Sequence, residues 1–449
     1  MNTRHLLLAC AVLALTAPDA PALAQVKSGV EQAAPNALSK AARDAALVAI
    51  AETVRAAYVF PEKDATIIAR LEKARLDGRY DTTDAGVFAE RVSEDLTAAS
   101  GDHHMYMLYD PAQYAAATSA GSANASVNEA AEAAFARSLA VRDHHGLVEQ
   151  KILPGNLRYL KIAAFQWVQD ETGTIYDEAL RFLKDGDAVV IDLRGNPGGS
   201  HPAVRYLVSH FMDGDVLEMT FLESGQTPVQ SRTLEHLPAG RLRGKPLYVL
   251  IDNNTGSAAE AFAYDIQQFK LGELVGATTA GAANNNRFLP IAPGFMLSVS
   301  FGRPVHAVSQ TNWDGTGVAP TVAARPEQAL AVAQSLALKR LAATPGASPE
   351  AKAEYAWASI DVAAGLNPVS IPPGKLKTWA GRYGEVTISL RDGKLWMARA
   401  DRPLRGLTAL TVDGLFAVDG SDMLRARFTA TGLETLWRGD PDPRVYPRI

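Results

Sequence analysis

Cysteine is nearly absent from this chain, because Cys10 is the only one in 449 residues. It lies in an N-terminal stretch that begins with basic residues, continues as an apolar run and ends in small residues at Ala24. That order is typical of a secretory signal peptide. We therefore predict a signal peptide over residues 1–24, cleavage after Ala24 and a periplasmic or secreted protein. A lipoprotein signal ending at Ala9 is the alternative, with a very short apolar core.

Removal of this segment would leave a mature chain without any thiol. Disulfides, thiolate metal sites and cysteine catalysis are then all excluded, although the compartment would be oxidising. The chain also has no His-Glu-x-x-His motif, and adjacent histidines alone are a weak metal signal. We therefore predict no metal and no cofactor.

The chain also carries no net positive charge. The formal net charge is −5, and no dense run of Lys or Arg is present, which argues against a nucleic-acid binder that works through a basic face. The N-terminal apolar run is too short to span a bilayer with the usual margin. We expect neither a nucleic-acid partner nor an integral membrane segment once the signal is removed.

Changes in composition and periodicity divide the rest of the chain. Three amphipathic helical patterns come first, an Ala/Ser-rich stretch follows, and a row of short alternating runs with Asp-Gly turns comes last. The predicted parts are a linker at 25–37, a helical subdomain at 38–100, a core at 101–343 with a surface excursion or lid at 112–145, a second linker at 344–369 and a small antiparallel β domain at 370–449.

Strand and helix patterns alternate within the predicted core. "LRYLKIAAF", "AVVIDL" and "PLYVLID" read as strands, and the last two are continuous apolar runs of the kind that are buried on both faces. Helical patterns separate them, at "IYDEALRFLKDG" and "PAVRYLVSHFM". The sequence therefore predicts an α/β fold with a largely parallel sheet, in which sites form in the loops after the strands.

Two such loops carry candidate chemistry. "RGNPGGS" follows one buried strand, and the amides of Gly198 or Gly199 could face an anion there, although a plain Pro/Gly turn is the commoner structure. Ser257 in "NNTGSAAEAFAYDI" follows the other strand and begins a helix. It could simply cap that helix, or it could be a nucleophile whose neighbour Ala258 supplies a second oxyanion amide. Spacing alone leaves both choices open.

Four motifs, taken together, resemble the tail-specific (C-terminal-processing) serine peptidase family. They are "AVVIDLRGNPGG", "TGSAAEAFA", "LVGATTAGAA" and "WDGTGVAPTV", and they cover roughly residues 100–325 in family-like order. The resemblance implies a crotonase-like (ClpP/crotonase type) β/α core. It also implies that the serine at the helix N-terminus, Ser257, is the nucleophile.

The family has two catalytic solutions, and the sequence distinguishes between them. The processing peptidases use a lysine where this chain has Ala282, and no lysine occurs between Lys270 and Lys339. The other branch, similar to the tricorn protease core and to interphotoreceptor retinoid-binding protein, uses a histidine from an Asp-x-His motif. Here "GDHHM" assigns that role to His104, and the resemblance implies Asp314 as its acidic partner, where many relatives have glutamate.

Other polar residues near these motifs have structural explanations. On a strand, His103 and His104 would face opposite ways, and we favour His104 as the base. We expect His201 to be a surface residue at a helix N-terminus and Glu260 to make a structural hydrogen bond in the core. We expect Asp192 and Arg194 to hold the glycine loop by an ion pair or backbone bonds.

The resulting hypothesis is a serine-type peptidase that cleaves peptides or proteins with Ser257, His104, Asp314 and an oxyanion hole made by Gly198 or Gly199 with Ala258. The alternative is a non-catalytic binding protein of the same fold for an apolar small ligand or peptide. A third hypothesis, a crotonase-type acyl-CoA enzyme, would not need a Ser-His-acid set, and export would separate it from acyl-CoA.

Overall fold

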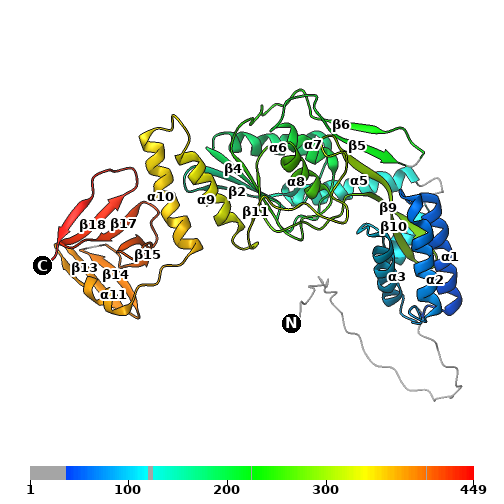
Figure 1. Cartoon of the computed structure of the whole chain (residues 1–449), viewed down its shortest axis with the longest axis horizontal. Coiled ribbons are helices and arrows are strands. Elements are labelled where there is room, and N and C mark those ends of the chain that lie inside the picture. Colours follow the sequence, from blue (N-terminus) through cyan, green and yellow to red (C-terminus); the bar gives the residue numbers. More distant parts are fainter. Residues whose placement is uncertain (1–36, 120–124, 224, 401) are drawn as a thin grey trace, which may run out of the picture. The chain divides into compact units, whose positions relative to one another are not determined.

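The computed structural model describes residues 37–119, 125–223, 225–400 and 402–449 (Figure 1). The expectations for the signal peptide, for Cys10 and for nearly all of the linker at 25–37 lie outside the described residues. In the part of the chain that is described, no helix is both long and apolar enough to cross a membrane.

The described chain begins with three helices, as the sequence predicts. Ser39 caps the first by accepting a hydrogen bond from the Ala42 amide, and Asp84 caps the third through the Val87 amide. Gly101 ends the third in a left-handed conformation, with φ 70°. The helices are α1 (Lys40–Ala57), α2 (Asp64–Leu76) and α3 (Ala85–Ser100), with a 3₁₀ turn, η1 (Pro61–Lys63), between the first two.

These helices do not enclose a core of their own. Their buried faces are the predicted ones, but they share one apolar cluster with two strands from much later in the chain. Phe88 of α3 lies 5.5 Å, centroid to centroid, from the ring of Phe295. The strands belong to a five-stranded antiparallel sheet in the order β1-β10-β5-β6, with β9 beside β10. Its members are β1 (Tyr106–Tyr109), β5 (Leu217–Glu223), β6 (Val229–Arg232), β9 (Asn285–Ile291) and β10 (Phe295–His306).

A second sheet has six strands in the order β11-β8-β7-β4-β3-β2, all parallel except for β2. The three predicted strands are β3, β4 and β7, of which β4 and β7 were predicted to be buried on both faces. Every residue of β4 and β7 is buried, which explains their continuous apolar runs. The strands are β2 (Leu147–Leu153), β3 (Leu157–Ile162), β4 (Ala188–Asp192), β7 (Leu247–Ile251), β8 (Glu273–Gly276) and β11 (Val322–Ala323).

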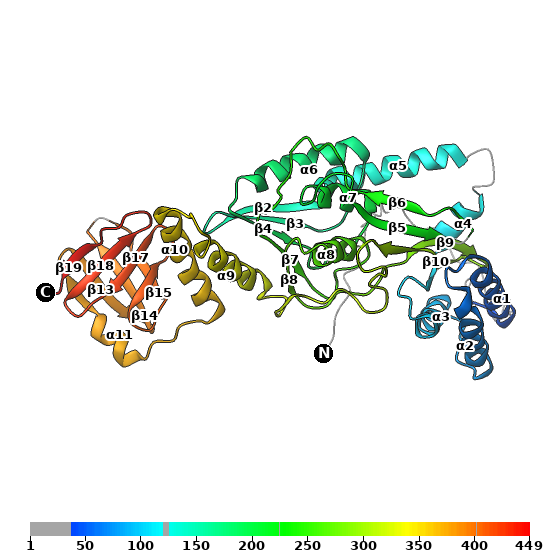
Figure 2. The same cartoon turned by 45° about the horizontal axis from the view of Figure 1, so that its top comes forward.

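Helices cover both faces of this sheet. Alternate residues of β4 divide between two apolar clusters: Val189 and Ile191 pack with α6, α7 and α8, whereas Val190 packs with α9 and α10. Figure 2 shows α6 and α9 on opposite sides of the strands. The helices are α6 (Gln169–Lys184), α7 (His201–Ser209), α8 (Ala258–Gln268), α9 (Ala329–Ala342) and α10 (Pro349–Leu366). The predicted mixed α/β fold is therefore confirmed.

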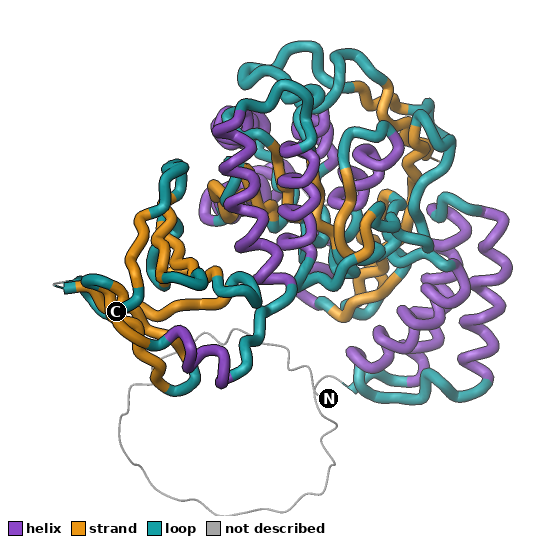
Figure 3. Tube along the Cα trace, turned by 60° about the vertical axis from the view of Figure 1, so that its left-hand side comes forward, coloured by secondary structure: helices purple, strands orange, loops and turns teal. Residues whose placement is uncertain are grey.

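The C-terminal region is an antiparallel meander of eight strands that follow one another in chain order (Figure 3). Asp392 and Gly393 both have positive φ, as the predicted Asp-Gly hairpin turn requires. A bridge between Tyr383 and Arg448 brings the two ends of the sheet together, close to a closed barrel. After helix α11 (Pro373–Trp379) come β12 (Gly381–Tyr383), β13 (Val386–Arg391), β14 (Lys394–Arg399), β15 (Arg405–Ala409), β16 (Leu415–Val418), β17 (Leu424–Phe428), β18 (Gly432–Trp437) and β19 (Arg444–Pro447).

Two segments differ from their expected form. Residues 344–369, expected to be a linker, contain α10, because Pro349 occupies the first helical turn and Ser348 caps it by accepting from the Ala351 amide. The excursion at 112–145 contains helices α4 (Pro111–Ser119) and α5 (Ala125–Arg142) and a 3₁₀ turn, η2 (His144–Gly146). The division of the chain into domains stays a prediction.

The shared cluster predicts a large stability effect at Phe88. Its side chain is fully buried, so Phe88→Ala should lower the free energy of unfolding by about 3–5 kcal/mol. Leu76→Ala on α2 is the control, because Leu76 is 70% exposed. Urea denaturation of both variants checks this, and equal losses in the two would contradict the shared core.

Candidate active site

Ser257 occupies the N-cap position of α8 with φ 48° and ψ −118°. Positive φ is uncommon for a residue with a side chain and costs about 1–3 kcal/mol when the surrounding structure imposes it. The strain arises where strand β7 turns sharply into α8. Ser257 is half-buried and lines a pocket. A simple cap needs neither feature, although the bond from the Ser257 amide to the Glu260 carboxylate is one that helix caps also make.

The pocket has a volume of about 450 Å³ and contains both predicted loops. Apolar side chains make up much of its wall, together with three consecutive asparagines. The lining includes Gly199, Ser257, Ala258, Asn284, Asn285, Asn286, Met219, Phe221, Val229, Phe301 and Trp313. It is large enough for a small organic ligand or several residues of a peptide, since ligand pockets span about 300–1,000 Å³.

The two glycines of the "NPGG" loop differ in their amides. The Gly198 amide donates to Asn196 Oδ1 at 2.8 Å, so it is already engaged. The Gly199 amide has no acceptor among the described residues, and the Ala258 amide is in the first turn of α8, where amides lack intrahelical acceptors. Gly199 and Ala258 both line the pocket, and among the described residues neither backbone amide has an acceptor.

Both positions require glycine, each because of a different neighbour. A Cβ on Gly198 would lie 2.7 Å from Ser257 Cβ, and one on Gly199 would lie 2.2 Å from the Phe165 carbonyl oxygen. Both glycines also have positive φ, 110° and 133°. A larger residue at 198 would push the glycine loop away from the Ser257 loop, and one at 199 would push it away from the Phe165 backbone.

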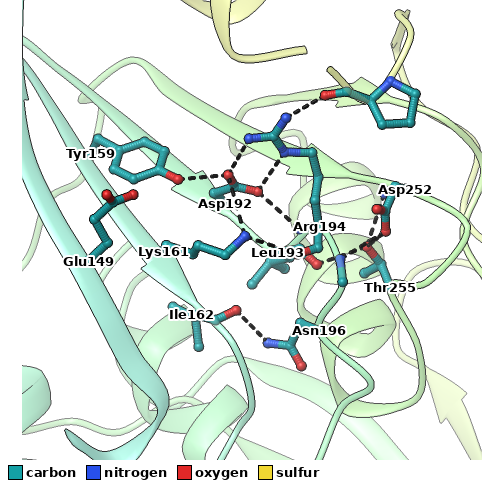
Figure 4. A network of polar contacts seen from close by, with 12 residues as sticks. Glu149, Tyr159, Lys161, Ile162, Asp192, Leu193, Arg194, Asn196, Asp252 and Thr255 are labelled. Carbon is teal, nitrogen blue, oxygen red and sulfur yellow. Dashed lines mark hydrogen bonds and ion pairs between the residues drawn. The ribbon is translucent and has the colours of Figure 1, made fainter. Parts of the chain in front are cut away.

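A network of polar contacts fixes the glycine loop, "RGNPGGS", where it leaves β4 (Figure 4). The Arg194 guanidinium donates twice to Asp192, at 2.9 and 2.5 Å, and also bonds the Pro326 carbonyl. Tyr159 donates to the same carboxylate at 2.7 Å. Burial alone would raise the pKa of Asp192, but the bonds from Arg194 and Tyr159 hold it below its ordinary value. The predicted ion pair of Asp192 and Arg194 is confirmed.

Further bonds tie this loop to the loop of Ser257. Asp252 accepts from the Gly195 amide at 3.0 Å, and Thr255 Oγ1 donates to the Leu193 carbonyl at 2.9 Å. The Gly256 amide donates to the Asn196 carbonyl at 2.9 Å. Figure 4 shows Asp252 and Thr255 beside the loop that begins at Leu193. The two strand-to-helix loops are thus joined just before Ser257.

Glu260, one turn into α8, is fully buried and accepts four hydrogen bonds. One bond comes from the Ser257 amide, at 2.8 Å, and a second comes from Thr279 Oγ1, at 2.6 Å. The other two come from the amides of Gly281 and Ala282. Burial raises the pKa of Glu260, and these bonds oppose the rise. The expected structural hydrogen bond is confirmed, and it anchors the loop that leads to Asn284.

Asn284 of the pocket contacts two aspartates, Asp102 and Asp314, and Asp102 in turn contacts His104. The Asn284 amide group donates to Asp102 Oδ2 at 3.0 Å and to Asp314 Oδ2 at 2.9 Å, and Asp102 Oδ1 accepts from the His104 backbone amide at 2.8 Å. The Asp314 carboxylate also accepts from the Ala283 amide at 3.1 Å. Asn284 therefore links the "GDHHM" and "NWDG" segments to the pocket.

The histidine ring has no partner in this arrangement. His104 Nδ1 is buried without a hydrogen bond, and within the described residues no bond joins the ring to Ser257 or Asp314. His103 is exposed, and both histidines lie in a turn before β1 rather than on a strand as we expected. The structure thus brings Ser257, Gly199 and Ala258 together at the pocket and leaves His104 and Asp314 nearby but unconnected to Ser257.

Burial sets the protonation of these groups. It lowers the pKa of His104, and the neighbouring Asp102 carboxylate only partly offsets this. Burial, together with the negative charge of Asp102, raises the pKa of Asp314 to about 6. At neutral pH these shifts favour a neutral His104 imidazole and an ionised Asp314.

Two pocket residues were not predicted as functional. His201 begins α7 as expected, but it is only partly exposed and lines the pocket, with Nε2 3.1 Å from Glu218 and 3.0 Å from Ser231 Oγ. Asn284 had no signal except its place in "GAANNN", two residues after Ala282, where the family's lysine would stand. Neither role follows from residue type alone.

A strained serine with two available amides in a pocket defines a candidate serine hydrolase. Residues 156–324 match the family model described as Peptidase family S41. This match supports, over residues 156–324, the tail-specific serine protease family that the motifs predict.

Individual relatives agree with this class. The carboxy-terminal processing protease CtpB of Bacillus subtilis is 27% identical over 179 residues, which are 39% of this chain and 35% of that protein. The nisin-resistance protein of Lactococcus lactis subsp. lactis is 29% identical over 124 residues, 25% of this chain and 39% of that protein. The chain thus spans well under half the length of either relative.

Solved structures with a similar arrangement include the photosystem II D1 C-terminal processing protease, with 14% identity, a TM-score of 0.40 and coverage of 64% of this chain and 94% of that one. A lipoprotein from Streptococcus agalactiae has 15% identity and a TM-score of 0.43, over 67% of this chain and 97% of that one.

The four bonds to Glu260 predict that its charge stabilises the site. Glu260→Gln keeps the size of the side chain but turns an NH₂ group toward two of the four donors, so the free energy of unfolding should fall by about 1–3 kcal/mol. Glu178→Gln on the exposed face of α6 is the matched control. Urea denaturation of both variants measures the difference, and a loss no larger than that of the control would refute this role.

Proposed function

We propose that the protein is a serine-type peptidase that cleaves peptide bonds through an acyl-enzyme. The observation that carries the proposal is a half-buried Ser257 with positive φ, which lines a pocket next to two unengaged amides. Its substrates would be peptides or proteins. We also propose a crotonase-like core and a periplasmic or secreted location.

In the proposed reaction, Ser257 Oγ gives its proton to His104 and forms a bond to the carbonyl carbon of the substrate. The amides of Gly199 and Ala258 donate to the oxyanion, a contribution worth roughly 10²–10³ in rate for each donor. When the C–N bond breaks, the proton passes from His104 to the leaving amine. Water then attacks the ester, His104 takes its proton, and release of the acid restores Ser257.

The sequence suggested Gly198 as a donor of the oxyanion hole, but we assign it a different role. Its amide is committed to Asn196, so we assign the oxyanion contacts to Gly199 and Ala258 alone. The role of Gly198 is to let its loop approach Ser257 closely, since a Cβ there would lie 2.7 Å from Ser257 Cβ. It is a positioning residue.

We propose Asp314 as the acid that orients His104. A carboxylate acceptor is needed for the ring nitrogen that faces away from the serine, and Nδ1 of His104 is buried without a partner. Asp102 already holds the backbone of His104, and Asn284 bonds both carboxylates. A movement on substrate binding that brings the imidazole to the Asp314 carboxylate would complete the set.

The alternative is a non-catalytic binding protein of the same fold for an apolar small ligand or peptide. One observation favours it: the pocket wall is rich in apolar side chains, including Met219, Phe221 and Trp313. A peptidase and a non-catalytic binding protein differ in one property that can be measured, the reactivity of the Ser257 hydroxyl.

A fluorophosphonate probe tests that reactivity. The probe should label the protein at Ser257, Ser257→Ala should abolish labelling, and His104→Ala should slow it by about 10²–10⁴-fold, because the general base is lost. Ser138→Ala, at an exposed serine on α5, should label normally. Mass spectrometry locates the adduct. Folded protein that takes up no probe would overturn the peptidase proposal in favour of binding.

The raised pKa of Asp314 predicts a pH profile. Below about pH 6 this carboxyl is protonated and cannot accept from His104, so the labelling rate should rise as the pH passes through about 6. Asp102→Asn should move this rise to lower pH, because a neighbouring negative charge is removed.

Asp314→Asn should remove the rise near pH 6 and lower the rate above it. Labelling rates from pH 4 to 9 for the three proteins distinguish the two aspartates. An Asp314→Asn profile that follows the wild type would eliminate Asp314 as the acid and leave Asp102 as the remaining carboxylate.

A further inference from the structure

The C-terminal meander contains a pocket of its own, with a volume of about 330 Å³. It lies on the inner face of the sheet, where strands β13 to β15 and β17 to β19 contribute side chains. None of its lining residues belongs to the candidate active site. Nothing in the proposed peptidase reaction uses it.

Strand register explains the composition of the pocket. Val386 pairs with Arg399 across β13 and β14, and Met397 pairs with Arg405 across β14 and β15. Because paired residues in an antiparallel sheet point to the same face, each guanidinium stands beside an apolar side chain. Val386 and Met397 are buried in the core of the sheet, whereas the arginines are half-buried. The pocket thus has an apolar floor and a cationic mouth.

The charges at the mouth are only partly neutralised. Arg399 pairs with Glu385 at 2.6 Å. Arg402 and Arg405 have no carboxylate partner within the described residues, and both line the pocket. Elsewhere in the same sheet, Arg427 pairs with Glu434. Among the described residues, two guanidiniums therefore stand without an ion-pair partner at the opening of one apolar cavity, and a bound anion would supply a partner.

The geometry points to a binding site for an alkyl carboxylate, a single anionic head group on an apolar chain of medium length. The head would accept hydrogen bonds from Arg402 and Arg405, and the chain would lie against Met397 and the rings of Trp437 and Tyr446. A volume of about 330 Å³ is near the lower limit of ligand pockets, about 300 Å³, which favours a medium chain over a long one.

The lining also discriminates against a peptide as the ligand. Away from the arginines, the polar groups of the lining side chains are the hydroxyls of Ser421, Thr435 and Tyr446 and the indole N–H of Trp437. A peptide backbone would bring amide and carbonyl groups that need partners when they are buried, and these four groups satisfy few of them. An alkyl chain brings no such groups.

Isothermal titration of the full-length protein with decanoate, below its micelle concentration, tests the proposal. Decanoate should bind saturably at one site, acetate should not bind because it lacks the chain, and decanol should bind more weakly because it lacks the charge. The Arg402→Gln, Arg405→Gln double variant should weaken decanoate binding roughly tenfold or more, since bonds to charged groups are lost. Ser257→Ala should bind decanoate normally, which separates this site from the peptidase proposal.

Arg391→Gln is the matched control, because Arg391 is an exposed arginine of the same sheet that does not line the pocket. Absence of saturable decanoate binding to folded protein would overturn the proposal. So would an equal loss in Arg391→Gln and in the double variant, which would indicate general charge attraction. Tighter binding of acetylated leucyl-leucine than of decanoate, with the same dependence on Arg402 and Arg405, would reassign the pocket to peptide C-termini.

Discussion

The candidate site depends on the close approach of two strand-to-helix loops. Gly198 and Ser257 come so near that a single added methyl group would collide with Ser257 and with the Ala258 amide. Such proximity needs a rigid support, because both loops carry positive φ angles that the chain would otherwise relax. The Asp192–Arg194 pair fixes one loop, the Asp252–Thr255 turn fixes the other, and the buried carboxylate of Glu260 bonds the Ser257 amide directly.

Electrostatics at the site follow from burial rather than from net charge. Asp102 and Asp314 are close enough for one negative charge to oppose the other, and the Asn284 amide between them donates to both. The two carboxylates, bridged by one amide, form a compact acidic group, and the pKa of Asp314, about 6, leaves that carboxyl mostly ionised at neutral pH. The positive charge of Lys63 opposes the rise in this pKa, and burial keeps the nearby His104 imidazole neutral.

Much of this arrangement could be predicted because it is encoded locally. The buried strands β4 and β7, the glycines after β4 and the serine at the start of α8 are each visible in a few consecutive residues. Asn284 could not be predicted, because its importance comes from bonds to residues 182 and 30 positions away in the chain. Helix α10 within residues 344–369 was not predicted, because Pro349 can end one element or begin the next, and only the Ser348 cap decides between them. We reasoned that His103 and His104 would face opposite ways on a strand, but they lie in a turn, whose side-chain directions have no fixed period.

The shared core of α1 to α3 with β9 and β10 has a consequence for biogenesis. A ribosome completes the three helices long before it reaches Phe295, their partner in the core. During the intervening synthesis of nearly two hundred residues, the apolar faces of these helices lack the strands that cover them in the native state. Contacts between such distant segments are slow to form, since a long loop must close first. The N-terminal helices are therefore early in the sequence but late in assembly, and the nascent protein depends on protection of that surface until β10 emerges.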